Sequence, residues 1–141
     1  MDRWITRIDH VGIAVADLDQ AVDFYARTFG FAKVHEEVNE GQGVREAMLA
    51  VGDSGVAIQL LAPLSPESTI GRFLERSGPG IQQMAYTVTN LEELSAHLRE
   101  NGVRLLYDEP RQGTAGTMIN FTHPKDTGGV LIELVEYPGT E

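Results

Sequence analysis

Cysteine is absent from all 141 residues of the sequence. This absence excludes disulfide bonds, thiolate metal sites and a cysteine nucleophile. It says little about the cellular compartment, because a protein without cysteine can function in either an oxidising or a reducing one. A metal site in this chain must therefore be built from nitrogen and oxygen ligands.

Basic residues are scarce, with 11 Lys and Arg against 21 Asp and Glu, which gives a formal net charge of −10. Nucleic acids and anionic membranes usually bind to surfaces with a surplus of positive charge. We therefore expect neither of them as a partner. A small anionic ligand is still compatible with the sequence if Arg45, Arg111 or Lys125 supplies a local positive field.

Long apolar runs are also missing. Residues 130–135 form one of the longest, and even this run contains an acid and is far shorter than the roughly 20 residues that span a bilayer. Residues 1–7 lack the basic segment and apolar core of a secretion leader. We therefore expect no membrane-spanning helix and a cytoplasmic location.

Alternating and β-branched apolar residues predict eight strands, separated by segments rich in glycine, proline and asparagine. The predicted strands are residues 8–15, 31–38, 43–51, 56–62, 81–89, 103–107, 117–122 and 130–136.

Helical spacing of apolar residues predicts three helices, at residues 18–29, 68–76 and 91–100. Asp17 and Asn90 are the expected N-caps, because their short polar side chains accept hydrogen bonds from the first helical turn. The order of elements is βαβββ, a connector with the short helix, and βαβββ again. This order predicts an α+β fold in a single domain, residues 1–141.

Two pairs of segments repeat along the chain. GVAIQLL at residues 55–61 resembles GVLIELV at residues 129–135, and DHVGIAV at residues 9–15 aligns with QQMAYTV at residues 82–88. The repeats therefore cover about residues 5–63 and 80–138, joined by residues 64–79. Two copies suggest halves that complete one cup-shaped mixed sheet with the helices outside, because repeat arrays normally need more copies to bury a core.

Four polar side chains occupy matched strand positions in the repeats: His10 aligns with Gln83, and Gln59 aligns with Glu133. A buried Glu133 without a partner would be costly, so a metal ion or a cationic side chain is expected beside it. His10 alone would more often be a hydrogen-bonded core residue than a metal ligand. The two glutamines are open to a second interpretation as hydrogen-bonding groups between the repeats.

Five motifs carry a family likeness. They are IDHVGIAV (8–15), QGVREAML (42–49), QLLAP (59–63), GVRLL (102–106) and HPKDTGGVLIEL (123–134). On these motifs the chain resembles the vicinal oxygen chelate, or glyoxalase-like, superfamily and within it the methylmalonyl-CoA epimerases. The resemblance implies a divalent metal ion, an acyl-CoA substrate and a homodimer.

The resemblance also implies a metal-ligand set of His, Gln, His and Glu. His10, Gln59 and Glu133 match three of these positions, whereas GPGIQQ at residues 78–83 has glutamine where the family has its second histidine. The repeat alignment selects Gln83 rather than Gln82 for that position. An amide oxygen binds borderline metals more weakly than imidazole does, so the choice among Co²⁺, Mn²⁺, Ni²⁺, Zn²⁺ and Mg²⁺ stays open and harder ions are better tolerated.

By the same resemblance, Glu46 and Glu133 are the catalytic pair. They would remove and return the proton at C2 of methylmalonyl-CoA on opposite faces, through an enolate that the metal ion stabilises as a Lewis acid. Two carboxylates suit this work if their surroundings raise the pKa of each toward neutrality. Whether Glu46 faces the site or the solvent depends on strand register, which the sequence leaves open.

Lys125 lies in a predicted turn before the last strand, and the resemblance places this turn at the mouth of the site, where Lys125 would meet an anionic substrate. Two other functions stay open: a metal-free binding protein of the drug-sequestration type, and another metal-assisted enzyme of the superfamily that acts on acyl thioesters. A retained Glu133 disfavours the metal-free protein, because the acid would then be buried without a cation.

Overall fold

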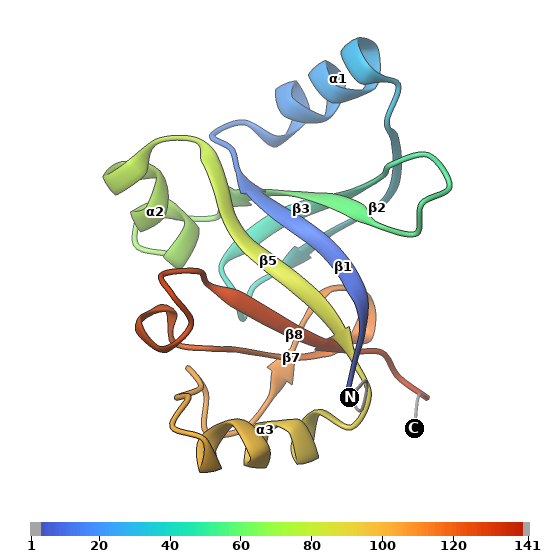
Figure 1. Cartoon of the computed structure of the whole chain (residues 1–141). Helices are drawn as coiled ribbons and strands as arrows, with labels where there is room; N and C mark the ends of the chain where they lie inside the picture. The colour runs from blue at the N-terminus through green and yellow to red at the C-terminus, as the bar shows by residue number, and fades with distance from the viewer. Residues whose placement is uncertain (1–3, 140–141) are drawn as a thin grey trace. The chain divides into compact units, whose positions relative to one another are not determined.

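The computed structural model describes residues 4–139. Residues 1–3, which belong to the segment predicted to lack a secretion leader, lie outside this range. Residues 140–141 of the predicted domain also lie outside it. In chain order the elements are β1 (Ile5–Ala14), α1 (Leu18–Phe29), β2 (Ala32–Asn39), β3 (Val44–Ala50), β4 (Ala57–Pro63), α2 (Thr69–Ser77), β5 (Gly80–Val88), α3 (Leu91–Glu100), β6 (Arg111–Gln112), β7 (Met118–Phe121) and β8 (Ile132–Glu136), with short 3₁₀ turns at Thr114–Gly116 and Pro124–Asp126 (Figure 1).

The strands pair in the same way in the two halves of the chain. β1 runs parallel to β4, and β4, β3 and β2 follow as antiparallel neighbours. β5 runs parallel to β8, and β8, β7 and β6 follow in the same antiparallel manner. The predicted α+β class with two βαβββ repeats is therefore confirmed, although the two-residue strand β6 at Arg111–Gln112 stands in place of the strand predicted at residues 103–107.

Contacts divide the chain into two compact units. One comprises residues 10–82, and the other comprises the residues before and after this range. The first five residues of β1 belong to the second unit, where Thr89 donates its backbone N–H to the carbonyl of Trp4 at 2.8 Å. The boundaries predicted for the domain and its repeats stay a prediction. No helix among residues 4–139 combines the length and the apolar character needed to cross a membrane.

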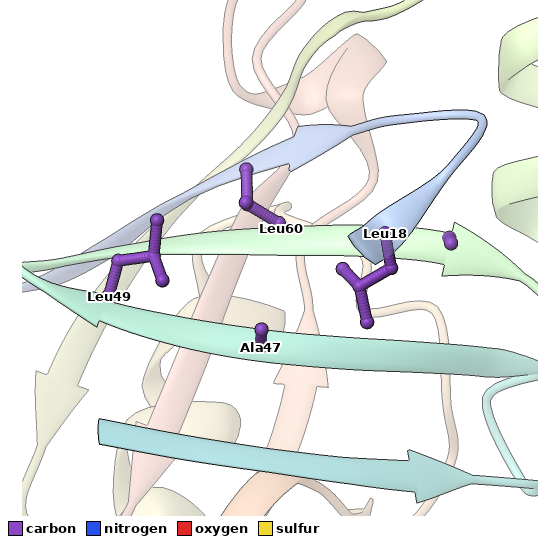
Figure 2. Close-up of a cluster of buried hydrophobic side chains, with 5 residues drawn as sticks. Leu18, Ala47, Leu49 and Leu60 are labelled. Carbon is purple, nitrogen blue, oxygen red and sulfur yellow. The ribbon is translucent and has the colours of Figure 1, made fainter. Parts of the chain in front are cut away.

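The core of the first unit forms where α1 covers one face of its strands. Leu18 of α1 packs with Ala47 and Leu49 of β3 and with Leu60 of β4, and all four are buried (Figure 2). Burial of one leucine contributes about 1.5–3 kcal/mol, so this small cluster holds α1 firmly against β3 and β4. The other face of these strands is left for the polar residues and for α2.

The helix α2 covers only one end of that second face. Ile70 packs against Ala14, Val44 and Leu61, which lie at the ends of β1, β3 and β4. Polar side chains occupy the part of the face beyond this cluster.

The second unit is also covered on one face by its helix. Leu91 and Leu94 of α3 pack on Val88 of β5 and Leu134 of β8. The opposite face carries an apolar cluster of Ala85, Ile119, Phe121 and Val135, with Tyr107 packed against it.

The predicted ends of α1 and α3 agree with the structure, whereas α2 begins and ends one residue later than predicted. Asp17 accepts a hydrogen bond from the backbone N–H of Gln20 at 3.0 Å, and Asn90 accepts one from Glu93 at 3.1 Å. Gly30 ends α1 with φ of 76°, a left-handed conformation that glycine adopts at little cost. These caps fix where each helix begins and ends.

The strand predicted at residues 103–107 is wrong. Only Leu105 forms an isolated bridge, to Thr122. The backbone N–H and carbonyl of Tyr107 bind the carboxamide of Asn120, at 3.1 and 3.0 Å, instead of a neighbouring strand. The segment is joined to residues 121–123 by two backbone hydrogen bonds, from Leu106 N–H to the carbonyl of Phe121 and from His123 N–H to the carbonyl of Arg104, each at 2.8 Å, and no residue in it is fully buried.

We predict that Asn120→Ala destabilises the protein by about 1–3 kcal/mol, because the buried backbone groups of Tyr107 lose their partners. Chemical denaturation monitored by circular dichroism measures the free energy of unfolding. Asn101→Ala is a matched control, since its carboxamide makes one exposed hydrogen bond, to the carbonyl of His97. Equal losses for the two variants would contradict this account of the segment.

Candidate active site

In the first unit, strand register places three predicted site residues on one face. His10 is opposite Ala57, two residues from Gln59 on β4, and Gln59 is opposite Met48, two residues from Glu46 on β3. Paired residues share a face of a sheet, and so do residues two apart on a strand. The side chains of His10, Gln59 and Glu46 therefore lie on the same face, opposite to α1.

Glu46 and Gln59 are in direct contact on this face. Gln59 Nε2 donates a short hydrogen bond to Glu46 Oε1, and the two residues are only 2% and 3% exposed. The register that the sequence left open is thus settled for this strand: Glu46 is buried and not solvent-facing.

Arg45 lies on the opposite face of β3 and interacts with other acids. Its guanidinium donates to Glu36 on β2 at 2.6 Å and to Asp19 on α1 at 2.8 Å. The hydrogen bond from Arg45 lowers the pKa of Asp19, and hydrogen bonds from Lys33 and Arg45 lower the pKa of Glu36. Arg45, the cationic residue next to Glu46 in the sequence, therefore lies on the other side of the sheet and does not pair with Glu46.

The second unit contains a similar buried pair. Gln83 Nε2 on β5 donates to Glu133 Oε1 on β8 at 2.6 Å, and both residues are 6% exposed. β5 and β8 are parallel neighbours, with Ala85 opposite Glu133. Gln82 precedes Gln83, and its buried carboxamide oxygen has no hydrogen-bond partner among the described residues. The contact to Glu133 thus distinguishes Gln83 from Gln82.

The donor atoms of these residues fit a divalent metal ion. A carboxamide that donates through Nε2 to a carboxylate can offer only its Oε1 as a ligand, and this applies to both Gln59 and Gln83. Amide and carboxylate oxygens suit ions harder than Zn²⁺. Within residues 4–139 no group of three or more His, Cys, Asp or Glu side chains is placed to hold a metal.

Sequence reasoning missed Asp9, which is buried in the second unit. Its Oδ2 accepts hydrogen bonds from Thr87 Oγ1 at 2.5 Å and from the hydroxyl of Tyr137 at 2.7 Å. Burial, together with this hydrogen bond, raises the pKa of Tyr137 to about 12. An acidic residue within an apolar strand could have indicated a buried, hydrogen-bonded position, but the interpretation of this strand was based on the neighbouring His10. Asp9 ties β1 to β5 and to the segment after β8.

Lys125 is exposed in the 3₁₀ turn Pro124–Asp126, which agrees with the predicted turn. Its ammonium group makes no hydrogen bond or ion pair within the described part of the chain. Asp126 beside it binds Arg104 at 2.8 Å, and this contact lowers the pKa of Asp126 to about 2. The structure therefore shows no hydrogen bond or ion pair between Lys125 and the Gln83–Glu133 pair of the same unit.

The comparison with protein families matches residues 9–121 to the glyoxalase/bleomycin resistance protein/dioxygenase superfamily. An ethylmalonyl-CoA/methylmalonyl-CoA epimerase of Cereibacter sphaeroides is 36% identical over 132 residues, which are 92% of this chain and 97% of that protein.

Solved structures agree with this match. Methylmalonyl-CoA epimerase from Mycobacterium tuberculosis is 55% identical, with a TM-score of 0.93 over 96% of this chain and 91% of that one. A variant of the Streptomyces coelicolor epimerase, in complex with 2-nitronate-propionyl-CoA, is 48% identical, with a TM-score of 0.93 over 97% and 98% of the two chains. The family resemblance seen in the sequence is therefore confirmed. The chain belongs to the glyoxalase/bleomycin resistance protein/dioxygenase superfamily and, within it, to the methylmalonyl-CoA epimerase family.

Proposed function

We propose that this protein epimerises methylmalonyl-CoA at C2, with Glu46 and Glu133 as the two proton-transfer groups. The observation that carries the proposal is the pair of buried carboxylates, each hydrogen-bonded to a carboxamide. Inversion at carbon needs two such groups, because the proton leaves one face and returns to the other.

The relatives support the choice of substrate. One solved methylmalonyl-CoA epimerase, 48% identical over 97% of this chain, is in complex with methylmalonyl-CoA and ammonium. The Cereibacter sphaeroides relative is named for both ethylmalonyl-CoA and methylmalonyl-CoA. We assign methylmalonyl-CoA to this chain and leave the longer acyl group as a substrate to be assayed.

Each carboxylate has one oxygen committed to its glutamine. The hydrogen bond from Gln59 orients Glu46, and the hydrogen bond from Gln83 orients Glu133. In the proposed reaction one carboxylate accepts the C2 proton, which leaves the electron pair in an enolate. The other group, initially protonated, then donates its proton to the opposite face of C2, so that protons and charge balance.

His10, Gln59, Gln83 and Glu133 would hold the divalent metal ion. When bound, the ion would supply Lewis-acid stabilisation of the negative charge that develops on the thioester oxygen. Within this scheme Gln59 has two roles, because its Nε2 orients Glu46 while its Oε1 is the atom suited to a metal. The burial of all four side chains would exclude water from the charges that develop during the reaction.

Three further expectations remain proposals. Lys125 would meet an anionic group of the substrate, the protein would form a homodimer, and it would act in the cytoplasm. Lys125 is exposed and its ammonium group has no partner among residues 4–139, which is compatible with the first of these.

We predict that the metal-loaded protein incorporates deuterium at C2 of methylmalonyl-CoA in D₂O. Enolate formation exposes C2 to protons that derive from solvent through the two carboxylates. Mass spectrometry and proton NMR follow the exchange after incubation with Mn²⁺, Co²⁺, Ni²⁺, Zn²⁺ or Mg²⁺ in turn. No exchange with any of these ions would reject the epimerase function and favour a binding protein.

We predict that Glu46→Gln lowers epimerisation by at least about 100-fold, because one face of C2 loses its proton-transfer group. Pure (2R) and (2S) substrates in D₂O reveal the cause. One enantiomer should still exchange its C2 proton without inversion, through Glu133, and the other should not exchange.

Glu133→Gln should show the opposite preference between enantiomers, provided that its metal content, measured separately, is restored. Glu36→Gln is the matched control, since Glu36 lies on β2 and pairs with Arg45 on the other side of the sheet. This control should keep the activity of the unmodified protein. Loss of exchange for both enantiomers in metal-loaded Glu46→Gln would contradict the two-base scheme.

We predict that Gln83→His tightens the binding of Zn²⁺ and Co²⁺ by about tenfold or more, because imidazole is a better donor to these ions than an amide oxygen. Isothermal titration calorimetry with the metal salts measures this without reference to activity. Gln82→His is the control and should leave affinity unchanged, because adjacent residues of a strand point to opposite faces. Equal effects of the two variants would remove Gln83 from the ligand set.

A further inference from the structure

A row of side chains crosses one face of the second unit, from Glu133 to the edge strand β6. Phe121 on β7 is directly opposite Glu133 on β8. The ring of Tyr107 meets the ring of Phe121 edge-on, with centroids 6.0 Å apart. The guanidinium of Arg111, on β6, lies over the ring of Tyr107 at 3.9 Å. The row thus joins the proposed proton-transfer group to an exposed cation.

Arg111 has no acidic partner among residues 4–139, a property that it shares with Arg72, Arg76 and Arg99. Arg27, Arg45 and Arg104 each bind a carboxylate. No carboxylate lies within ion-pair distance of Arg111 among residues 4–139, and its contact is with an aromatic face. In a chain with a net charge of −10, an exposed guanidinium without an acid is a local positive site.

A second guanidinium converges on the same tyrosine. Arg99 on α3 donates to the backbone carbonyls of Tyr107 and Asp108, each at 3.1 Å. Asn120, which is fully buried, holds the backbone N–H and carbonyl of Tyr107. The backbone of Tyr107 is therefore held in place from two sides, and its ring lies under the guanidinium of Arg111.

We propose that Arg111, stacked on Tyr107, binds a phosphate group of the coenzyme A part of the substrate. This inference rests on the proposed function for the identity of the ligand. Stacking uses the face of the guanidinium and leaves the N–H groups at its edge available, and these match two phosphate oxygens at once.

The length of the row favours a phosphate, rather than the carboxylate of the acyl group, as the ligand of Arg111. β8 and β6 are separated by two strand spacings, which is about 10 Å. The acyl carboxylate is attached to C2 itself and must stay close to the proton-transfer group. The phosphates of coenzyme A are carried on the pantetheine arm away from C2, so they can reach a cation at the edge of the sheet while the acyl carboxylate stays beside the proton-transfer group.

We predict that Arg111→Gln raises KM for methylmalonyl-CoA about tenfold with little change in kcat, because a charge-assisted hydrogen bond to phosphate is lost. The N-acetylcysteamine thioester of methylmalonate lacks all phosphates, and its kcat/KM should be the same for Arg111→Gln as for the unmodified protein. A fall in kcat/KM with both substrates would mean that Arg111 serves the acyl group, and it would overturn the inference.

Arg76→Gln is the matched control. Arg76 is also an exposed arginine over an aromatic ring, that of Phe73 at 5.8 Å, but it lies on α2 in the other unit. Arg76→Gln should keep the KM of the unmodified protein. An increase equal to that of Arg111→Gln would show a general effect of surface charge and would overturn the assignment to Arg111.

Binding of free coenzyme A separates this inference from the proposed function. Calorimetry at low salt should show about tenfold weaker binding to Arg111→Gln than to the unmodified protein, and the difference should shrink as salt screens the charge. Pantetheine should bind both proteins equally. If the deuterium exchange occurs but coenzyme A binds both proteins equally, the inference fails and the epimerase function stands. If coenzyme A binding depends on Arg111 but no exchange occurs, the phosphate site stands and the catalytic proposal fails.

Discussion

A carboxylate buried in a sheet must be compensated, and this constraint organises both units. Glu46 and Glu133 are almost fully inaccessible to water, and each accepts a hydrogen bond from a glutamine on the neighbouring strand. A neutral amide satisfies one oxygen without cancelling the charge, whereas an arginine would form an ion pair and hold the carboxylate as an anion. Arg45, adjacent in sequence to Glu46, is instead bound to Asp19 and Glu36 on the other side of β3. The carboxylates are thereby kept oriented, and in the proposed reaction they exchange a proton with C2.

Strand alternation is what separates the polar and apolar roles. In the first unit, Ala47, Leu49 and Leu60 face α1 and form the core, while Glu46 and Gln59 point the other way. In the second unit, Leu134 packs with α3, while Glu133, its neighbour in sequence, lies opposite Phe121. In each unit one helix, α1 or α3, therefore stabilises the strands from one face, and the buried glutamate lies on the other face. The same alternation places the row from Glu133 to Arg111 on one surface.

Much of the fold was predictable because it depends on local signals. Asp17, Asn90 and Gly30 marked helix ends through cap chemistry that involves only a few neighbouring residues. The strand predicted at residues 103–107 failed for a non-local reason: Asn120, far along the chain, binds the backbone of Tyr107. Asp9 was missed in the same way, because its partners Thr87 and Tyr137 are distant in sequence. Apolar spacing reports burial, but it does not report which backbone groups pair.

The sequence by itself determined the α+β class, the repeated order of elements and the family, because motifs and periodicity are properties of short segments. The alignment of its two halves also selected the four candidate metal ligands, and the family resemblance added Glu46. Only the tertiary structure decided that Glu46 is buried with Gln59, that Gln83 rather than Gln82 meets Glu133, and that Arg111 lies on Tyr107. Each of these facts depends on strand register or on contacts between distant segments, and a shift of one residue would reverse the face that every side chain occupies.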